Sequence, residues 1–219
     1  MHNSHSERMA WRRSIHTVRW GVLIVWAMFA YGTPVGAVLV DKLVAVVNGE
    51  ILTVQDFEDH LALRSIYQPD VNDSDRQQAF QGLVDQVLLR QEALRTRLVQ
   101  VDDAEVSQHL QALDQPPQRG KALVKVMQER GLSRHDVRAW IRDYLIVRAF
   151  IDRRVRLFVR IPDNQIAQYY QDHQQAIGEP LDEAVRKQIG CVLTERQVNR
   201  RLTELLAELR KKGQLDFPP

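Results

Sequence analysis

The residues that most often carry catalysis or hold metals are scattered along this chain rather than grouped. Four histidines lie beyond residue 37, and no two have the spacing of a metal-binding pair: His60, His109, His135 and His173. The sequence has no Gly-rich phosphate loop, no nucleophile elbow and no Cys-x-x-Cys motif. The acidic pairs Asp102-Asp103 and Asp182-Glu183 fall at expected helix starts, where the helix dipole accounts for them. We therefore expect no enzymatic activity, no metal and no cofactor.

Two other sets of side chains suggest chemistry but have plainer explanations. Arg134, Arg138 and Arg142 recur every four residues on one face of an expected helix. Such a stripe could bind an acidic ligand, but we favour a solvated face with ion pairs. The single cysteine, Cys191, allows no internal disulfide and lies in a strongly helical pattern, so we expect a packing residue rather than a reactive thiol.

Charge does not point to nucleic acid. The chain of 219 residues carries 30 basic and 28 acidic residues. Residues 1–37 hold four of the basic and one of the acidic residues, which leaves 26 against 27 in the rest. The body after residue 37 is therefore nearly neutral and mixed in sign, and its length allows a sizeable core.

Residues 1–37 have the order of a secretory signal peptide. A basic region ends at Arg19, an uncharged apolar run follows, and Val35-Gly36-Ala37 supplies the small residues of a cleavage site. We expect cleavage between Ala37 and Val38. The alternative is an uncleaved membrane anchor, because residues 20–40 carry no charge and are about long enough to span a bilayer. Either outcome exports the body, and membrane contact would come only through residues 20–40 if they are retained.

The chain is organised around residues 41–56. Leu43, Val44, Val46 and Val47 form a short apolar strand pattern that stops at Asn48-Gly49, a pair that favours a two-residue hairpin turn. Ile51 and Leu52 then fold back as a second strand, and Thr53 with Asp56 begins a helix. A lone hairpin is marginal in water, so it needs a further strand and helical cover.

The rest of the chain predicts a mainly α protein. Apolar residues recur at three- and four-residue spacing in seven segments. The expected helices are about 53–66, 74–96, 102–114, 121–130, 133–155, 161–173 and 181–212. Residues 67–73 form an expected loop, and Leu215–Phe217 is the remaining strand candidate.

Together these motifs resemble a known family. The strand-turn-strand Lys42–Thr53 after a signal peptide, followed by helices, resembles the N-terminal chaperone domain of SurA-like periplasmic proteins. Ile161–His173 resembles the family's helix before its parvulin prolyl isomerase domain, and Leu181–Ile189 with Arg196–Phe217 resembles the helix and strand after it. The resemblance implies a multi-helix core with a small antiparallel sheet, formed by the N-terminal hairpin and the returning C-terminal strand.

The chain departs from the family where the parvulin domain would stand. Only residues 175–180 connect the two flanking segments, far fewer than an independent domain needs. We therefore expect an N-terminal helical chaperone domain at 38–174, a linker at 175–180, and a segment at 181–219 that completes the same core. The family's isomerase activity is not expected here.

The resemblance implies a non-enzymatic periplasmic chaperone. Its partners would be unfolded outer-membrane or secreted polypeptides, held in an apolar groove. The candidate groove residues are Tyr67, Trp140, Tyr144, Tyr169 and Tyr170, and the alternative for each is an ordinary core or boundary position. Two other functions stay open at this point. One is a membrane-tethered scaffold that binds a single folded partner, and the other, disfavoured, is a prolyl isomerase.

Overall fold

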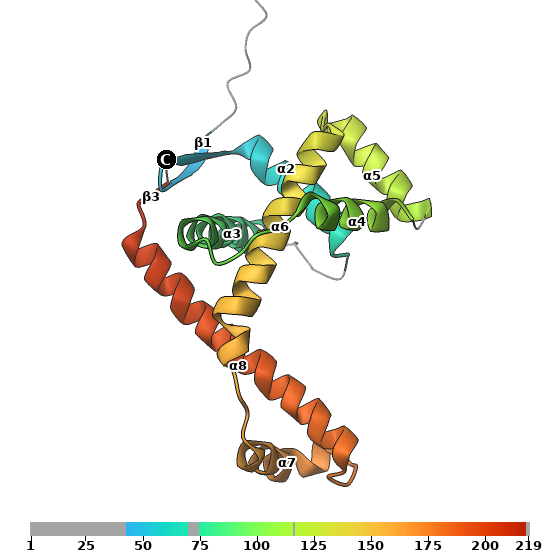
Figure 1. Ribbon diagram of the computed structural model, residues 1–219, viewed down its shortest axis with the longest axis vertical. Helices are drawn as coiled ribbons and strands as arrows, with labels where there is room; N and C mark the ends of the chain where they lie inside the picture. Colours follow the sequence, from blue (N-terminus) through green and yellow to red (C-terminus); the bar gives the residue numbers. More distant parts are fainter. Residues whose placement is uncertain (1–42, 70–74, 116, 218–219) are drawn as a thin grey trace, which may run out of the picture. The chain divides into compact units, whose positions relative to one another are not determined.

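The computed structural model describes residues 43–69, 75–115 and 117–217 (Figure 1). The expected signal segment with its cleavage site at Ala37 and Val38, and part of the expected loop at 67–73, lie outside the described residues. The described residues are mainly α-helical with one small sheet, which confirms the expected fold class. In chain order the elements are β1 Leu43–Val47, β2 Glu50–Thr53, α2 Val54–Tyr67, α3 Arg76–Thr96, α4 Asp103–Asp114, α5 Pro117–Arg130, α6 Arg134–Arg154, the 3-10 turn η1 Arg156–Phe158, α7 Asp163–Ile177, α8 Glu183–Lys212 and β3 Leu215–Asp216.

The hairpin forms as the sequence predicts. Asn48 and Gly49 have φ angles of 51° and 86°, the left-handed values that a two-residue hairpin turn requires. β1 and β2 pair antiparallel on either side of this turn. The C-terminal strand β3 pairs with the other edge of β1, with Leu215 opposite Val47, so the strand order is β2-β1-β3. The predicted return of the C-terminus to the hairpin is therefore confirmed.

Asn48 joins the sheet to α3 and to the C-terminal segment. Its side-chain amide donates to Gln91 Oε1 at 2.8 Å, and its Oδ1 accepts from the backbone N–H of Gln214 at 2.8 Å. The backbone N–H of Asn48 donates to the Gln214 carbonyl at 2.8 Å, and Gln91 Nε2 also donates to the Val47 carbonyl. One turn residue thus holds three segments that are far apart in sequence.

Helix starts follow the sequence signals. Thr53 with Asp56, and Ser133 with Asp136, form complete capping boxes at α2 and α6. One expected boundary moves: the start of α5 lies at Pro117 rather than near residue 121, since proline fits the first turn of a helix. Residues 156–158, between α6 and α7, form the 3-10 turn η1.

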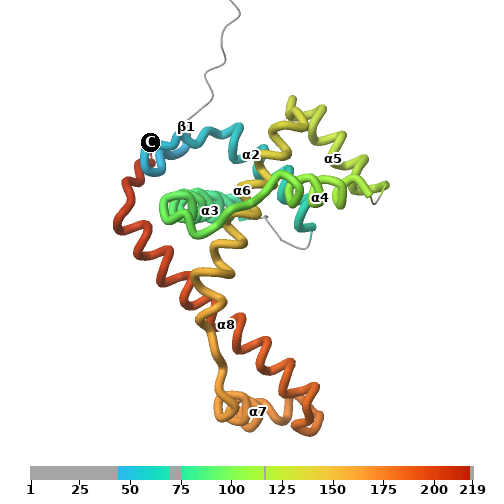
Figure 2. Tube along the Cα trace, in the orientation of Figure 1, coloured from blue at the N-terminus to red at the C-terminus, as the bar shows by residue number. Residues whose placement is uncertain are grey.

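Three buried clusters make up the core of the described residues. The helices and strands that contribute to them can be followed in the trace of Figure 2. The first joins the sheet to α2 and α3 and includes Val47, Phe57 and Val84. The second lies among α2, α4, α5 and α6 around Leu123 and Ile141. The third lies between α3 and α6 and is covered by partly buried leucines of α8. Its buried residues are Leu89, Ala93, Val99, Ile146, Val147 and Phe150.

Among the described residues, the first half of α8 is covered mainly by α7. Residues 178–182 connect the two helices directly, and α7 packs against α8 but buries no residue fully. Val185, Ile189 and Val198 are the buried residues of α8. The expectation that Cys191 is a packing residue is wrong: Cys191 is exposed, because α7 covers one face of this part of α8 only.

Candidate functional site

A groove of about 760 Å³ lies between α3, α6 and α8. Its apolar lining comes from side chains on all three helices: Leu89, Val147, Ile151, Leu202 and Leu206. Polar residues lie around this apolar strip: Gln68, Asp85, Gln86, Arg148, Asp152 and Arg156. Tyr144 also lines the groove, next to Gln68.

Helix periodicity explains why the groove is apolar. Val147 and Ile151 are four residues apart on α6, and Leu202 and Leu206 are four apart on α8. Residues at this spacing share one helix face, so each helix turns an apolar stripe toward the others. The leucines of α8 pack against the third core cluster but stay partly exposed. The result is an apolar strip that is not fully covered by the protein itself.

An aromatic cluster continues from one end of this strip. The Trp140 and Tyr144 rings stack with 8° between their planes and 5.9 Å between centroids. Tyr67 meets both edge-on, at 5.5 Å from Trp140 and 4.7 Å from Tyr144. The structure therefore brings together three of the five aromatic residues that the sequence proposed, although only Tyr144 lines the groove itself.

Hydrogen bonds fix the orientation of these three rings. Gln68 Nε2 donates to the Tyr144 hydroxyl at 2.9 Å, and Trp140 Nε1 donates to His60 Nδ1 at 3.2 Å. The Tyr67 hydroxyl is bonded to His109 Nδ1. Burial, and next the nearby Tyr144, raise the pKa of Tyr67 to about 12, so Tyr67 keeps its proton at neutral pH.

Sequence reasoning missed both histidines of the cluster. His60 is 4% exposed and is the buried polar residue among the described residues. Its signal was its position three residues after Phe57 and three before Leu63, both buried on the inner face of α2. A histidine at such a position on an apolar face needs a hydrogen-bond partner, and Trp140 supplies one.

The other two proposed residues, Tyr169 and Tyr170, lie elsewhere on α7. The Tyr169 ring stacks on His173 at 4.1 Å, and the Arg196 guanidinium lies 5.0 Å from its centroid. The Tyr170 hydroxyl donates to the Glu179 carbonyl at 2.9 Å. Both side chains thus hold the α7–α8 pair together and do not line the groove.

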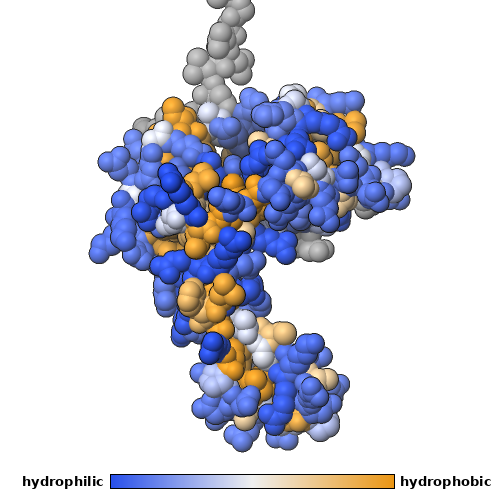
Figure 3. All heavy atoms as spheres, viewed as in Figure 1, coloured by the Kyte–Doolittle hydropathy of each residue, from blue (hydrophilic) through white to orange (hydrophobic). Residues whose placement is uncertain are grey.

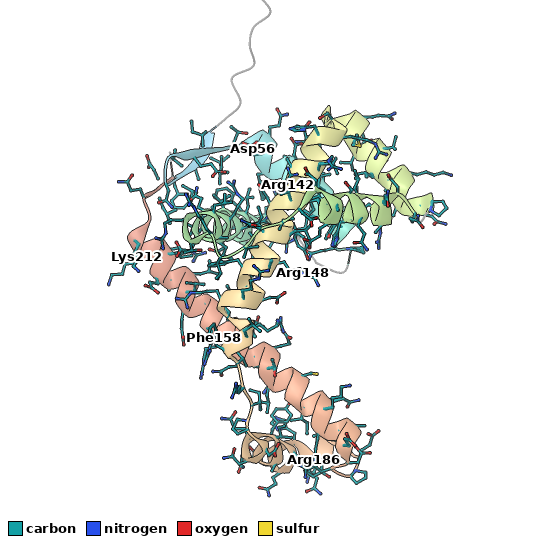
Figure 4. All side chains as sticks on the ribbon, in the orientation of Figure 1. Asp56, Arg142, Arg148, Phe158, Arg186 and Lys212 are labelled. Atoms are coloured by element: carbon teal, nitrogen blue, oxygen red, sulfur yellow. The ribbon has the colours of Figure 1, made fainter. Side chains whose placement is uncertain are left out.

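Most charges around the groove are paired. Asp85 contacts Arg210 at 2.6 Å, and Arg156 pairs with Asp152 at 3.0 Å and with Glu195. Burial raises the pKa of Asp85, and the charge of Arg210 offsets part of that rise. Arg148, which projects from the middle of α6 (Figure 4), has no ion pair within the described part of the chain. The groove therefore carries one cation that is free to meet a bound group.

The arginine stripe of α6 pairs with α4 instead of forming a ligand site. Arg134 contacts Asp114 at 3.2 Å, Arg142 contacts Asp103, and Arg138 donates to the Ser107 hydroxyl at 3.0 Å. These partners confirm the expectation of a solvated face with ion pairs. Within residues 43–69, 75–115 and 117–217, no three potential metal ligands gather at one place. Every helix of that part is too short or too polar to cross a bilayer.

The space-filling view shows hydrophobic residues exposed on this face of the molecule (Figure 3). A groove with an apolar floor, a stacked tyrosine at one end and a mixed polar rim suits binding of polypeptide side chains.

Comparison with known proteins identifies the family of the chain. No curated protein matches the chain. One solved structure has 9% sequence identity and a TM-score of 0.49, covering 81% of this chain and 99% of its own; it comes from a study of PEB4 and Cj1289, two structurally related SurA-like chaperones of Campylobacter jejuni. The model of the SurA-like N-terminal domain matches residues 10–151, more than half of the sequence. The chain therefore belongs to the family of SurA-like N-terminal domains.

Proposed function

We propose that this protein is a chaperone that holds unfolded polypeptide segments in the groove between α3, α6 and α8. The observation that carries the proposal is the partly exposed apolar strip formed by Ile151, Leu202 and Leu206 beside the buried Val147. Family membership supports a chaperone role, and the groove supplies a place for it. Its volume of about 760 Å³ lies within the range of ligand-binding clefts.

The groove favours weak and unselective binding. Its walls are the sides of three helices, and its polar rim alternates acids, arginines and amides. An extended chain could lay apolar side chains on the strip while its backbone meets Gln68 or Gln86 at the rim. Tyr144 offers a flat ring held in place by Trp140, Tyr67 and Gln68. Such a site grips many sequences without strong preference, as a holding chaperone requires.

The family and the N-terminal segment support a proposal for the place of action and the clients. SurA-like chaperones are periplasmic, and residues 1–37 predict export. The clients we propose are outer-membrane or secreted polypeptides. In this proposal, residues 38–174 and 181–219 act as one chaperone unit, with 175–180 as the point where other family members insert a parvulin domain.

Suppression of aggregation tests the proposal. The protein is mixed at equal molar ratio with an unfolded porin, and light scattering is followed. Leu206→Lys puts a charge on the strip, and Ala207→Lys puts the same charge on the exposed neighbouring position of α8. Burial of one leucine by the client is worth about 1.5 kcal/mol, so Leu206→Lys should bind clients about ten-fold more weakly. Ala207→Lys should match the unaltered protein.

A photo-crosslinker locates the contact. Benzoylphenylalanine in place of Gln86 lies at the groove, and the same residue in place of Gln111 lies on an exposed face of α4. Crosslinks to many clients at Gln86 and few at Gln111 are expected. One stoichiometric folded partner at Gln86 would favour the scaffold alternative, and no delay of scattering together with no crosslinks would reject the groove.

A prolyl isomerase is not supported by the described residues. Residues 178–182 join α7 to α8 directly, so the described chain contains no parvulin domain at that point. We expect no acceleration of cis–trans exchange in a proline-containing peptide above that given by an inert protein. A clear acceleration would reopen this alternative.

A further inference from the structure

A second surface lies where α6 ends and does not belong to the groove. Leu157 and Phe158 are 71% and 63% exposed, two of the most exposed large apolar side chains among the described residues. They are neighbours in η1, the turn that follows α6, and the buried Val155 fixes the start of that turn. Figure 4 shows Phe158 at this point, beside the middle of α8, and Figure 3 shows hydrophobic atoms there in the same view.

Arginines surround this apolar pair from three sides. Arg153 and Arg154 are in the last turn of α6, Arg160 follows η1, and Arg201 comes from α8. Arg201 donates to the Phe158 carbonyl at 2.9 Å, and Arg153 donates to the Leu98 carbonyl at 2.8 Å. Arg154, Arg201 and Phe158 line one shallow pocket. We name Arg153, Arg154, Leu157, Phe158, Arg160 and Arg201 the elbow surface.

The arginines of the elbow surface keep their charge available. Each has no carboxylate within 4 Å among the described residues, although several acids lie nearby. Those acids have other partners: Asp152 and Glu195 pair with Arg156, Glu204 with Arg200, and Glu208 with Lys212. Carbonyl contacts hold Arg153 and Arg201 in place without neutralising them. Glu204 and Glu208 line the same pocket as Arg154, Arg201 and Phe158. The surface therefore presents two apolar side chains among four arginines and these two acids, which pair with Arg200 and Lys212.

We propose that the elbow surface docks on the surface of an anionic phospholipid membrane. Leu157 and Phe158 enter the boundary between headgroups and acyl chains, and the arginines meet the lipid phosphates. Charge complementarity favours an anionic partner, and the fluid acyl boundary accepts a protruding leucine and phenylalanine without a matched pocket. The expected export of the chain places it beside phospholipid leaflets. This proposal rests on the elbow surface alone and stands whether or not the groove binds clients.

A local probe tests this docking in the full chain. Cys191→Ser removes the exposed thiol, and Leu157→Cys then carries an environment-sensitive nitrobenzoxadiazole dye. Because residues 20–40 are themselves apolar, the readout must report position 157 and not recruitment of the whole chain. Ile51→Cys with the same dye is the control, since Ile51 is 61% exposed on the hairpin. Phosphatidylglycerol vesicles should brighten and blue-shift the dye at 157, and spin-labelled acyl chains should quench it, with neither effect at 51.

Removing the charges distinguishes the lipid surface from other partners. Arg154→Ser and Arg160→Ser each remove the charge of an exposed arginine that has no hydrogen bond or ion pair with the described residues. Each should weaken the vesicle-dependent signal about five-fold. Circular dichroism checks that these variants fold. The proposal is overturned if uncharged phosphatidylcholine vesicles give the same signal, or if the dye at 157 does not respond to anionic vesicles. An equal response to soluble polyglutamate would also overturn it, in favour of an acidic protein partner.

Discussion

Two parts of the described chain are both built from amphipathic helices but differ in how completely the apolar faces are buried. The first, termed the core, contains the sheet, helices α2 to α6 and the end of α8. The second, termed the arm, contains α7 and residues 183–198 of α8. The core closes three buried clusters, while α7 buries no residue fully and its partner stretch of α8 buries three.

The difference lies in the number of partners for each apolar stripe. A helix of the core contacts two or more elements, so its stripe is covered from several sides, whereas α7 and the start of α8 cover mainly each other. Val192 is 42% exposed although its position fits the apolar stripe of α8. Periodicity therefore shows that a helix has an apolar face but not how completely the face is buried. Stability should accordingly be concentrated in the core.

A matched pair of isoleucines tests this contrast with the largest expected effect. Ile141 is 0% exposed in the core, and Ile189 is 5% exposed in the arm. Ile141→Ala leaves a cavity among α2, α4, α5 and α6 and should lower the free energy of unfolding by about 4 kcal/mol. Ile189→Ala should lower the free energy of unfolding by about 2 kcal/mol, because α7 is the main partner of this part of α8 and can relax. Urea unfolding measures both, and equal losses would contradict the contrast.

The C-terminal strand β3 completes the sheet, and Asn48 binds this segment to the core. Asn48→Ala removes side-chain bonds to Gln91 and Gln214 and places alanine at a φ of 51°. The expected loss is about 3 kcal/mol, from hydrogen bonds and left-handed strain together. Asn48→Gly keeps the turn conformation and should lower the free energy of unfolding by about 2 kcal/mol, from the lost hydrogen bonds.

Hydrogen exchange distinguishes this effect from general destabilisation. In Asn48→Ala, amides of β3 and of the last turns of α8 should exchange faster than those of α4 and α5. The C-terminal end would then behave like the arm. Uniform acceleration across the chain would show that Asn48 does not specifically hold this segment.

Local signals made much of the fold predictable from sequence. Asn48-Gly49, the two capping boxes and the short strand candidate Leu215–Phe217 each specify structure over a few residues. The turn and the capping boxes form as expected, and the strand forms at Leu215–Asp216. Thr53 shows why: its hydroxyl needs only the N–H of Asp56, three residues away. Such interactions do not depend on which helices meet.

The site was less predictable because it depends on helix pairing. Trp140 and Tyr144 share a face of α6 by their spacing, so their stacking could be anticipated. Nothing in the spacing of Tyr169 indicates that α7 meets α8 and not the groove. Leu202 and Leu206 line the groove because α8 passes α3 and α6 at these two residues, which the sequence pattern does not specify. The exposure of Cys191 was missed for the same reason. Its place in a helical pattern did not reveal that α7 would be the main helix packed against this part of α8.

The smallest effect is a difference in pH dependence between core and arm. Burial raises the pKa of Asp85 in the core, and the hydrogen bond from Arg156 lowers the pKa of Glu195 in the arm. The folded state thus binds the Asp85 proton more tightly than the unfolded chain does, so Asp85 subtracts stability as the pH rises from about 4. Glu195 adds stability above the ordinary glutamate pKa, and this stability is lost as the pH falls through the lowered value.

Replacing each acid by its amide should therefore change the stability profile in opposite directions. Asp85→Asn should remove a loss of stability that occurs as the pH rises. The free energy of unfolding of this variant should therefore fall less between pH of about 4 and 7 than that of the unaltered protein. Glu195→Gln should remove a loss of stability that occurs as the pH falls. The free energy of unfolding of this variant should therefore fall less below pH of about 4.5 than that of the unaltered protein. Urea midpoints across this range measure the slopes, which are independent of any constant offset from losing Arg210 or Arg156 as partners. If both amides changed the slope in the same direction, burial would not be what separates the electrostatics of the core from those of the arm.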